Sequence, residues 1–366
     1  ARARGQNRQR QGYTDSYDML GEAALTAADA QHNLAAYTAS IKALRPLCTS
    51  PDIRDNPGIS IKLSAIHPRY EFIQRARVMA ELVPRTLALA RQAKDAGMGL
   101  NIDAEEAARL ELSLDVIEAV LSDKSLAGWD GFGVVVQAYS KRAAPVIDWL
   151  YALASRLDRR IMVRLVKGAY WDTEIKRAQV DGLRAFPVFS RKPATDLSYI
   201  CCTQKLLGMS DRIYPQFATH NAHTVAMVIE LAQGRDIFEF QRLHGMGEAL
   251  HSRVLETQSA RCRIYAPVGT HRDLLAYLVR RLLENGANSS FVNQIVSKSV
   301  PAAEICADPF DAWDQTGGAA SAAIVAPASL FGAARKNSKG WDLQDPVNVA
   351  TIDAARARFK ARTWDC

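Results

Sequence analysis

The segment Leu274–Glu284 (LLAYLVRRLLE) places a tyrosine and two adjacent arginines at helical spacing. Tyr277, Arg280, Arg281 and Glu284 stand at positions i, i+3, i+4 and i+7, so they share one face of a helix. A guanidinium group can bind a carboxylate through two parallel hydrogen bonds, so this face suits a small anion. A solvated helix face with an Arg280–Glu284 ion pair fits the same spacing, and periodicity alone leaves both interpretations open.

Polar side chains also stand at the ends of the short apolar runs that follow one another along the chain. They are Lys62, Asp103, Gln137, Arg164, Lys167, His220, Gln241, His244 and Tyr265. Strand interiors are normally apolar, so polar side chains there need partners. In a barrel these side chains converge on the rim at the carboxyl ends of the strands, where barrel enzymes have their active sites. Their recurrence across nearly every strand predicts one shared polar pocket.

Other spacings are less specific. His220 and His223 form an H-x-x-H pair, but the first ends a predicted strand, the second begins a helix, and no further ligand is identifiable, so no metal site is predicted. Arg191 and Lys192 lie in a predicted loop, where they could hold a phosphate or remain on the surface. No nucleophile elbow and no Cys/His pairing points to covalent catalysis.

The elements that must position these residues alternate between short β-rich runs and longer helical patterns, as βαβ units do. The predicted strands are Tyr17–Leu20, Ile59–Ser64, Leu100–Asp103, Gly133–Ala138, Met162–Lys167, Pro215–His220, Phe238–His244 and Arg263–Val268. The predicted helices are Ala23–Leu44, Arg75–Ala96, Glu105–Leu121, Ala144–Leu157, His223–Gln233 and His271–Asn285. The last helix has Thr270 as its N-cap and Gly286 as its C-cap.

This order predicts an α/β protein with a (β/α)8 TIM barrel. An open doubly wound sheet of seven strands is the alternative if the short run Tyr17–Leu20 is not a strand. No GxGxxG motif follows a strand and no Walker loop occurs, which favours the closed barrel. The helix after the final strand could flank the barrel or lie over its mouth.

The bulk composition is that of a globular enzyme. The 366 residues suit one large domain, predicted over 13–300, with a basic N-terminal arm over 1–12 and an extension over 301–366. The net charge of +7 includes arginines at positions 2, 4, 8 and 10. Such an arm could contact nucleic acid or an anionic membrane, or be a terminal tail. No basic face with interleaved aromatics and no helix-turn-helix occurs, so no nucleic-acid partner is predicted.

The six cysteines include no CxxC pair, and Cys201 and Cys202 are adjacent, so reduced thiols and a cytoplasmic location are expected. The arginines at the start are not followed by the apolar core of a signal peptide. No run approaches the roughly 18 apolar residues of a membrane span.

Six longer runs carry a family pattern: Tyr17–Gln31, Ile59–Tyr70, Arg164–Arg177, Tyr214–Thr224, Phe238–Glu248 and Arg263–Asn293. In these runs the chain resembles the proline dehydrogenase half of the bifunctional proline utilization A (PutA) flavoenzymes. The resemblance implies a barrel with FAD at the carboxyl ends of the strands and a final helix folded over the mouth. The chain departs from the family pattern in the segments Gly247–Arg263 and Cys306–Ala326.

Position by position, the resemblance implies two overlapping sets of site residues. Those matching the proline pocket are Lys62, Asp103, Tyr170, Leu243, Tyr265, Tyr277, Arg280 and Arg281. Those matching the FAD site are Asp103, Gln137, Arg164, Lys167, Gly168, Tyr170, Trp171, Ser190, Arg191, Lys192, Thr195, Thr219, His220, Asn221, Gln241, Glu284, Ser290 and Phe291. Arg164 is expected near the flavin N5 atom, and Arg191 and Lys192 near the pyrophosphate.

The implied reaction is the oxidation of L-proline to Δ1-pyrroline-5-carboxylate, with hydride transfer from C5 to flavin N5, the first step of proline catabolism. A membrane quinone would then reoxidise the flavin through peripheral contact at the inner face of the membrane. Family members also carry an aldehyde dehydrogenase half, which this chain is expected to lack.

Other functions remain possible on the residues alone. A different barrel enzyme, such as an aldolase with Lys62 or Lys167 as its Schiff-base lysine, or a metal-assisted hydrolase, is one alternative. A nucleic-acid-binding module is the other.

Overall fold

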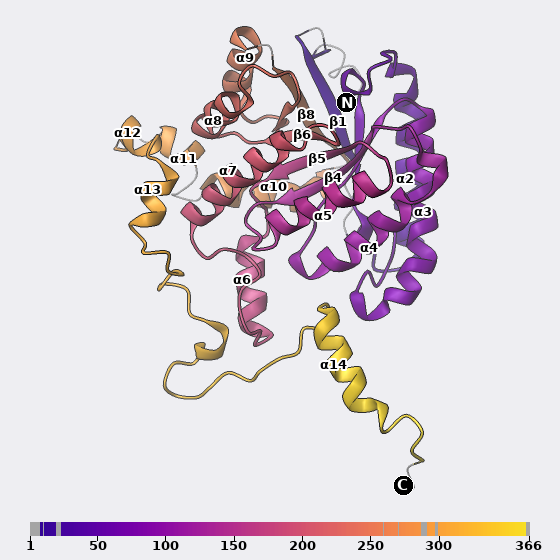
Figure 1. Ribbon diagram of the computed structural model, residues 1–366, viewed down its shortest axis with the longest axis vertical. Helices are drawn as coiled ribbons and strands as arrows, with labels where there is room; N and C mark the ends of the chain where they lie inside the picture. The colour runs from indigo at the N-terminus through magenta and orange to yellow at the C-terminus, as the bar shows by residue number, and fades with distance from the viewer. Residues whose placement is uncertain are drawn as a thin grey trace.

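In the computed structural model, eight parallel strands close into a barrel in the order β1 to β8, so the predicted (β/α)8 fold is confirmed (Figure 1). The structure describes residues 8–9, 11–19, 23–258, 260–269, 271–286, 291–296 and 299–363. The strands are β1 (Tyr13–Met19), β2 (Gly58–Ile61), β3 (Gly99–Ile102), β4 (Phe132–Gln137), β5 (Ile161–Val166), β6 (Ile213–Ala218), β7 (Glu239–Leu243) and β8 (Arg261–Val268). The run that sequence analysis placed first is therefore a strand, pairing with β2 and closing on β8.

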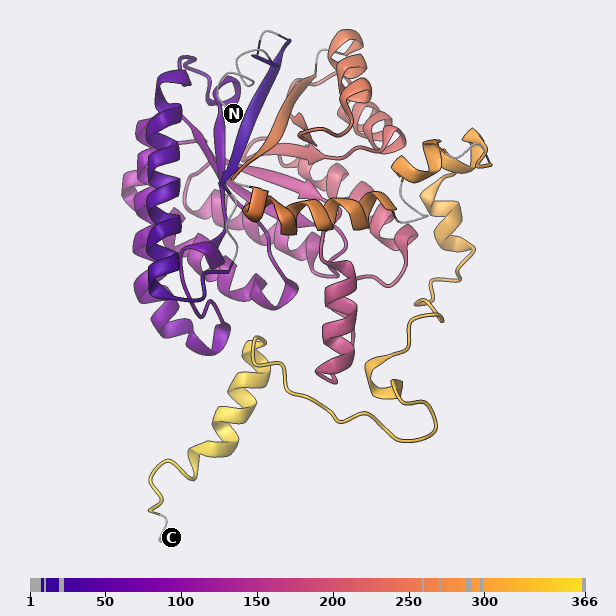
Figure 2. The same cartoon turned by 180° about the vertical axis from the view of Figure 1, so that it is seen from behind.

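Helices surround the strands and connect each one to the next (Figures 1 and 2). Those that follow β1 to β7 are α2 (Ala27–Leu44), α3 (Arg75–Asp95), α4 (Leu110–Leu121), α5 (Ala143–Arg156), α6 (Trp171–Val180), α7 (Lys192–Gly208), α8 (Ala222–Ala232) and α9 (Glu248–Thr257). After β8 come α10 (His271–Gly286), α11 (Phe291–Val296), α12 (Ala302–Ile305), α13 (Pro309–Asp314) and α14 (Pro346–Ala357). In Figure 2, α10 crosses in front of the strands.

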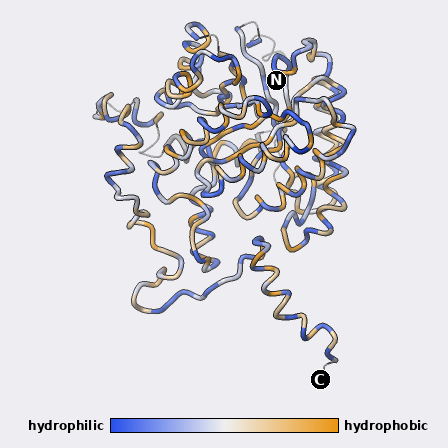
Figure 3. The backbone as a smooth tube through the Cα atoms, viewed as in Figure 1, coloured by the Kyte–Doolittle hydropathy of each residue, from blue (hydrophilic) through white to orange (hydrophobic). Residues whose placement is uncertain are grey.

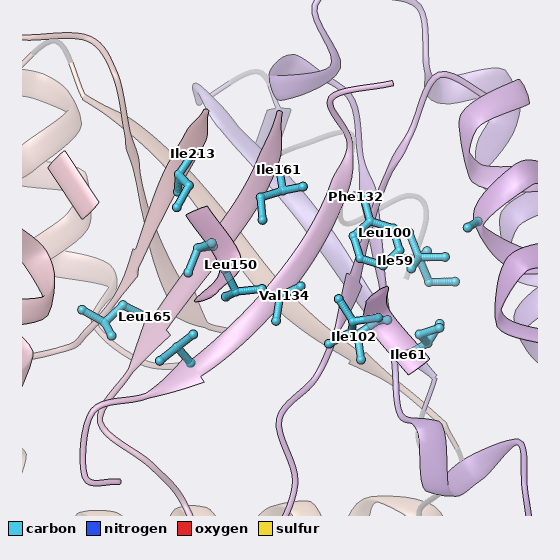
Figure 4. Packing of buried hydrophobic residues seen from close by; sticks show 14 of the residues in the cluster. Ile59, Ile61, Leu100, Ile102, Phe132, Val134, Leu150, Ile161, Leu165 and Ile213 are labelled. Carbon is cyan, nitrogen blue, oxygen red and sulfur yellow. The ribbon is translucent and has the colours of Figure 1, made fainter. Parts of the chain in front are cut away.

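The core lies between the outer face of the barrel and the helices. Apolar residues alternate along the strands, so Ile59 and Ile61 of β2 and Leu100 and Ile102 of β3 all lie in one buried cluster (Figure 4). The residues between them are polar, as Ser60 shows. The strand period of two therefore sends apolar side chains toward the helices and polar ones toward the barrel interior.

Polar residues fill part of the barrel interior. Glu239, almost fully buried, accepts hydrogen bonds from Arg263 Nε (2.8 Å), Gln216 Nε2 (2.9 Å) and Gln241 Nε2 (2.8 Å). Asn101 of β3 donates to Gln216 of β6 across the barrel at 2.8 Å. Every buried charge here has a partner, as burial requires.

Two predicted helices begin later than expected. The helix placed at Ala23–Leu44 begins at Ala27, because Thr26 is its N-cap and forms a capping box with Asp29. The helix placed at Glu105–Leu121 begins at Leu110. The Glu105 carboxylate accepts from the Ser64 N–H (3.1 Å) and Arg109 Nη1 (2.5 Å), which holds residues 104–109 in a turn and a short 3-10 helix.

The prediction of a loop at Arg191 and Lys192 was wrong. Arg191 is the N-cap of α7, and Lys192 and Thr195 belong to that helix. A proline at the start of α7 suits the first helical turn, where its missing N–H needs no partner. Helices α6, α9 and α14 were also absent from the predicted set.

The C-terminal segment runs outside the barrel as short helices joined by irregular chain (Figure 1). Helix α13 packs against α7. Further along, Asn337 Nδ2 donates to the Gln179 carbonyl oxygen at 2.9 Å, and Gly340 N donates to Gly182 O at 3.1 Å. Along α14, hydrophobic and hydrophilic residues alternate (Figure 3).

The predicted division into arm, barrel domain and extension stays a prediction. Within the arm, residues 1–7 and 10 lie outside the described part of the chain, whereas Arg8 donates to Asp15 Oδ1 at 2.7 Å. In the described residues, no helix is both long and apolar enough to cross a bilayer. The five described cysteines, at positions 48, 201, 202, 262 and 306, are free thiols.

Candidate active site

A cavity of about 390 Å³ lies at the carboxyl ends of the strands. Each strand contributes a lining residue, either its own or one directly after its end, and α10 supplies residues from the other side. All but one of the polar residues predicted at the strand ends line this cavity; the exception is His244, whose Nδ1 atom lies 3.2 Å from Arg8 Nη1. Helix α10 lies over the barrel mouth rather than on its flank (Figure 2). The residues from α10 in the lining are Tyr277, Arg280 and Arg281.

A network of buried charges forms the wall of this cavity beside β1, β2 and β3. Lys62 Nζ donates to both carboxylate oxygens of Asp18 at 2.9 Å and to Asp103 Oδ2 at 3.2 Å. Arg164 Nη1 donates to the other oxygen of Asp103 at 2.8 Å. The two carboxylates thus hold the two cations in fixed positions, and all four side chains are at least nine-tenths buried.

Tyr265 joins this network from β8. Its hydroxyl donates to Asp103 Oδ2 at 2.8 Å, and the Arg164 guanidinium lies 5.2 Å from the centre of its ring. Arg164 Nη2 also donates to Ser60 Oγ at 3.0 Å. Tyr265 is therefore oriented at both its hydroxyl and its ring, which leaves little freedom for its side chain in the pocket.

The Lys62 amine is held in its charged form. Burial alone would lower its pKa, but Asp18, Tyr265 and Asp103 together raise the pKa of Lys62 well above its ordinary value. A lysine that forms a Schiff base must lose its proton first. The network therefore disfavours Lys62 as a nucleophile and suits it as a fixed positive charge.

The arginines of α10 contact aromatic rings. The Arg280 guanidinium lies 5.7 Å from the Tyr170 ring centre, and the Arg281 guanidinium lies 5.3 Å from that of Tyr277. Tyr277 is buried, whereas Leu275 and Leu282 on the same helix are 64% and 72% exposed. The helix therefore turns Tyr277, Arg280 and Arg281 to the cavity, and Leu275, Leu278 and Leu282 to solvent.

A second cluster of charges lies at the start of α7. Asp196 pairs with Lys167 and, at 2.6 Å, with Lys192 Nζ. Two ammonium groups thus share one carboxylate, which leaves this end of the cavity positive. Burial lowers the pKa of Lys167, although Asp196 opposes this.

His220 is held neutral between β6 and β7. Burial, together with the nearby His251, Arg281 and Arg242, lowers the pKa of His220 to about 3. Its Nε2 atom accepts the backbone N–H of Leu243 at 3.0 Å, so the ring proton is on Nδ1. In the described residues, no group of three His, Cys, Asp or Glu side chains is placed to hold a metal ion.

Only glycine fits at position 168 in the turn after β5. Its φ of +132° is rare for residues with a side chain, and a Cβ atom there would lie 2.5 Å from the Tyr139 ring. The absence of a side chain keeps the turn against Tyr139, with its backbone on the cavity wall.

The structure brings most of the predicted site residues to this cavity. All of the proposed proline-pocket residues line it: Lys62, Asp103, Tyr170, Leu243, Tyr265, Tyr277, Arg280 and Arg281. So do these residues of the predicted FAD set: Asp103, Gln137, Arg164, Lys167, Gly168, Tyr170, Lys192, Thr219, His220, Asn221, Gln241 and Phe291.

Four predicted FAD residues do not line the cavity. Trp171 Nε1 donates to the Phe189 carbonyl oxygen at 2.8 Å, and Thr195 is buried in α7. Ser190 Oγ accepts the backbone N–H of Ser321 at 3.0 Å, and Arg191 Nε donates to the Ala319 carbonyl oxygen at 2.9 Å. Ser190 and Arg191 therefore contact the C-terminal segment. The side chain of Glu284 and all of Ser290 lie outside the described residues.

Sequence reasoning missed other lining residues. They are Asp18, Ala104, Val135, Val166, Ala169, Ala218, Arg242 and Met246. Asp18 had one available signal, because it is a charged residue inside a run interpreted as a strand. Its partner is 44 positions away in the sequence, so spacing could not show the pair.

Comparisons with known proteins show the family of this chain. The sequence model of the family described as proline dehydrogenase matches residues 1–294. The bifunctional protein PutA of Escherichia coli is 50% identical over 379 aligned residues, which cover 100% of this chain and 29% of that protein. PutA of Rhizobium meliloti is 53% identical over 371 residues, covering 99% of this chain and 30% of that protein.

Solved structures show the same likeness. The crystal structure of a bifunctional proline utilization A (PutA) protein superposes with a TM-score of 0.91 at 54% identity, covering 97% of this chain and 36% of that one. A mutant of Bradyrhizobium japonicum proline utilization A gives a TM-score of 0.90 at 53% identity, covering 99% and 38%. The chain spans about a third of the length of these relatives. With the family match over most of its residues, this chain belongs to the proline dehydrogenase family.

Proposed function

We propose that this chain oxidises L-proline to Δ1-pyrroline-5-carboxylate with FAD as its cofactor, the first step of proline catabolism. One observation carries the proposal: the arginine pair of α10 faces the buried network of Asp103, Lys62 and Arg164 across a single cavity. A cyclic amino acid offers a carboxylate to the arginines and an amine to the acidic side of the network. The family match supports this assignment.

The residues of the cavity fit a flavin dinucleotide. The shared Asp196 leaves positive charge on Lys167 and Lys192, which suits a pyrophosphate. Arg164 Nε is buried and has no hydrogen-bond partner among the described residues, so the guanidinium keeps a donor available. Gln137, Thr219, His220, Asn221 and Gln241 add amide, hydroxyl and imidazole groups on the same wall. When bound, the flavin supplies the acceptor for the substrate hydride.

Three groups of residues would position the substrate. Arg280 and Arg281 would bind its carboxylate. Tyr265, Tyr277 and Leu243 would pack against its ring and present the C5 hydrogen. Lys62 and Asp103 would orient the ring from the opposite side of the cavity to α10, since each is fixed by the network.

We propose two further partners from the resemblance to the longer relatives. We infer that a membrane quinone reoxidises the cofactor through peripheral contact, and that the protein works in the cytoplasm at the inner face of the membrane. An aldehyde dehydrogenase half in the same polypeptide would receive the product. The resemblance to bifunctional PutA proteins supports the second catalytic half.

An absorbance spectrum tests the central proposal. The purified protein, loaded with FAD, should show flavin bands that bleach when proline is added without oxygen. A protein that takes up no flavin, or whose flavin stays oxidised with proline, contradicts the proposal. Trapping of a lysine adduct by borohydride with a carbonyl substrate would instead indicate an aldolase.

A further inference from the structure

Two acidic residues of the described chain line the cavity, and one of them, Asp18, comes from β1. Both of its carboxylate oxygens accept hydrogen bonds from Lys62 Nζ at 2.9 Å. The residue is 1% exposed, and Lys62 is 5% exposed. A buried carboxylate costs free energy unless it is paired, so removing either side chain leaves the other as an uncompensated buried charge.

The charges of the network balance. Asp18 and Asp103 contribute carboxylates, Lys62 and Arg164 contribute cations, and each is bonded to at least one group of the opposite sign. Burial raises the pKa of Asp18, and the Lys62 ammonium opposes that rise. On the other side of the cavity, Arg280 and Arg281 add positive charge. The cavity therefore has a neutral wall facing a cationic one.

We infer that Asp18 is a specificity-determining residue that makes the pocket select a zwitterionic amino acid over a simple ring carboxylate. The inference rests on the proposed function, because it concerns the charge state of that same substrate. Asp18 acts through Lys62, so it is a positioning residue that need not touch the substrate.

The physical reason is the net charge of the wall formed by Asp18, Lys62, Asp103 and Arg164. With Asp18 ionised, the charge of Lys62 is cancelled, and a substrate ammonium is not repelled from Asp103. Without that carboxylate, Lys62 and Arg164 would face Asp103 alone, and the wall would carry a net positive charge. Such a wall repels an ammonium and attracts a carboxylate, so the two kinds of ligand should respond in opposite directions.

The test compares two ligands of the FAD-loaded protein that share a ring and a carboxylate. Proline carries the ammonium, and its apparent affinity is the concentration that gives the half-maximal rate of anaerobic flavin reduction. Cyclopentanecarboxylate has a methylene in place of the nitrogen, and its inhibition constant is measured against proline. The ratio of the two constants reports the preference for the zwitterion.

In Asp18→Asn this preference should fall roughly tenfold, because removing one unit charge near the ammonium is worth about that factor at an effective dielectric constant of about 20. Lys62→Met should raise the preference, because it leaves the wall negative. The double variant should return toward the wild-type ratio, because its wall is neutral again. Asp15→Asn is the matched control, a buried carboxylate of the same strand that pairs with Arg8 and does not line the cavity.

An unchanged ratio in folded, flavin-containing Asp18→Asn would overturn the inference. If Asp18→Asn does not fold, the decision moves to the other two variants, because equal ratios in Lys62→Met and the double variant would also overturn it. Failure of the wild-type flavin to bleach with proline would instead refute the proposed function.

Discussion

The Arg280 guanidinium of α10 lies 5.7 Å from the ring centre of Tyr170 in the turn after β5. This contact joins the helix over the barrel mouth to the backbone that Gly168 holds against Tyr139. Helix α10 and the turn after β5 are thus connected through a cation–π contact, a type of interaction that gains strength when water is excluded. Binding of an anion between the walls and placement of α10 are expected to be coupled.

Replacing Arg281 with methionine should weaken proline binding while flavin remains bound. Truncating one partner of a buried charged pair costs about 2–5 kcal/mol of binding free energy. Because Arg281 is only partly buried, we expect a loss near the lower value, which corresponds to about a thirtyfold rise in KM. Steady-state kinetics measure the KM for proline, and the absorbance of the purified variant measures its flavin content. Arg253→Met, an exposed arginine of α9, is the control and should behave as wild type. An unchanged KM in Arg281→Met would show that α10 does not bind the carboxylate.

Replacing Tyr265 with serine should narrow the gap between proline and 4-hydroxyproline. The ring of Tyr265 is fixed by Asp103 and Arg164, so it should crowd a substituent on the substrate ring. Discrimination of this kind is typically worth about 1–3 kcal/mol in kcat/KM. Tyr265→Phe keeps the ring and should keep most of the discrimination. A proportional loss of both activities together with flavin would mean that Tyr265 serves only the fold.

Replacing Glu239 with leucine should destabilise the barrel strongly, because Arg263 would stay buried without its carboxylate. Breaking one partner of a buried pair typically costs about 3–5 kcal/mol. The double variant Glu239→Leu/Arg263→Met removes both charges and should recover much of that loss. Urea denaturation followed by circular dichroism gives the free energies of unfolding. Equal stability of the single variant and wild type would contradict the role assigned to this pair.

Acid should destabilise the protein partly through His220. Its pKa is lowered to about 3 in the folded state, against an ordinary value of about 6.5 in the unfolded chain. Below about pH 6.5 the unfolded state therefore binds a proton that the folded state does not, and stability falls until about pH 3. His220→Asn should lose less stability than wild type between pH 7 and pH 5 in urea denaturation. An equal loss in both proteins would mean that His220 titrates normally.

Local patterns determined much of this protein. The alternation of β-rich runs and helical periodicity predicted the barrel, because strand and helix periods depend on neighbours a few positions apart. The polar residues at the strand ends predicted one pocket, because parallel strands bring their carboxyl ends to one rim. Helix α7 escaped prediction because its apolar residues form no pronounced helical stripe. Helix α6 does have such a stripe, with Ile175 and Ala178 buried on one side, so its periodicity was a signal that went unused.

Only the tertiary structure decided which residues meet. Periodicity left α10 free to flank the barrel or to cover it, and the position of Tyr277 against the cavity settles this. Asp18 and Lys62 are 44 residues apart, and Lys62 and Tyr265 are 203 apart, so no spacing rule connects them. Closure of β1 onto β8 brings these ends of the chain together, and the cost of burying unpaired charge then selects the partners.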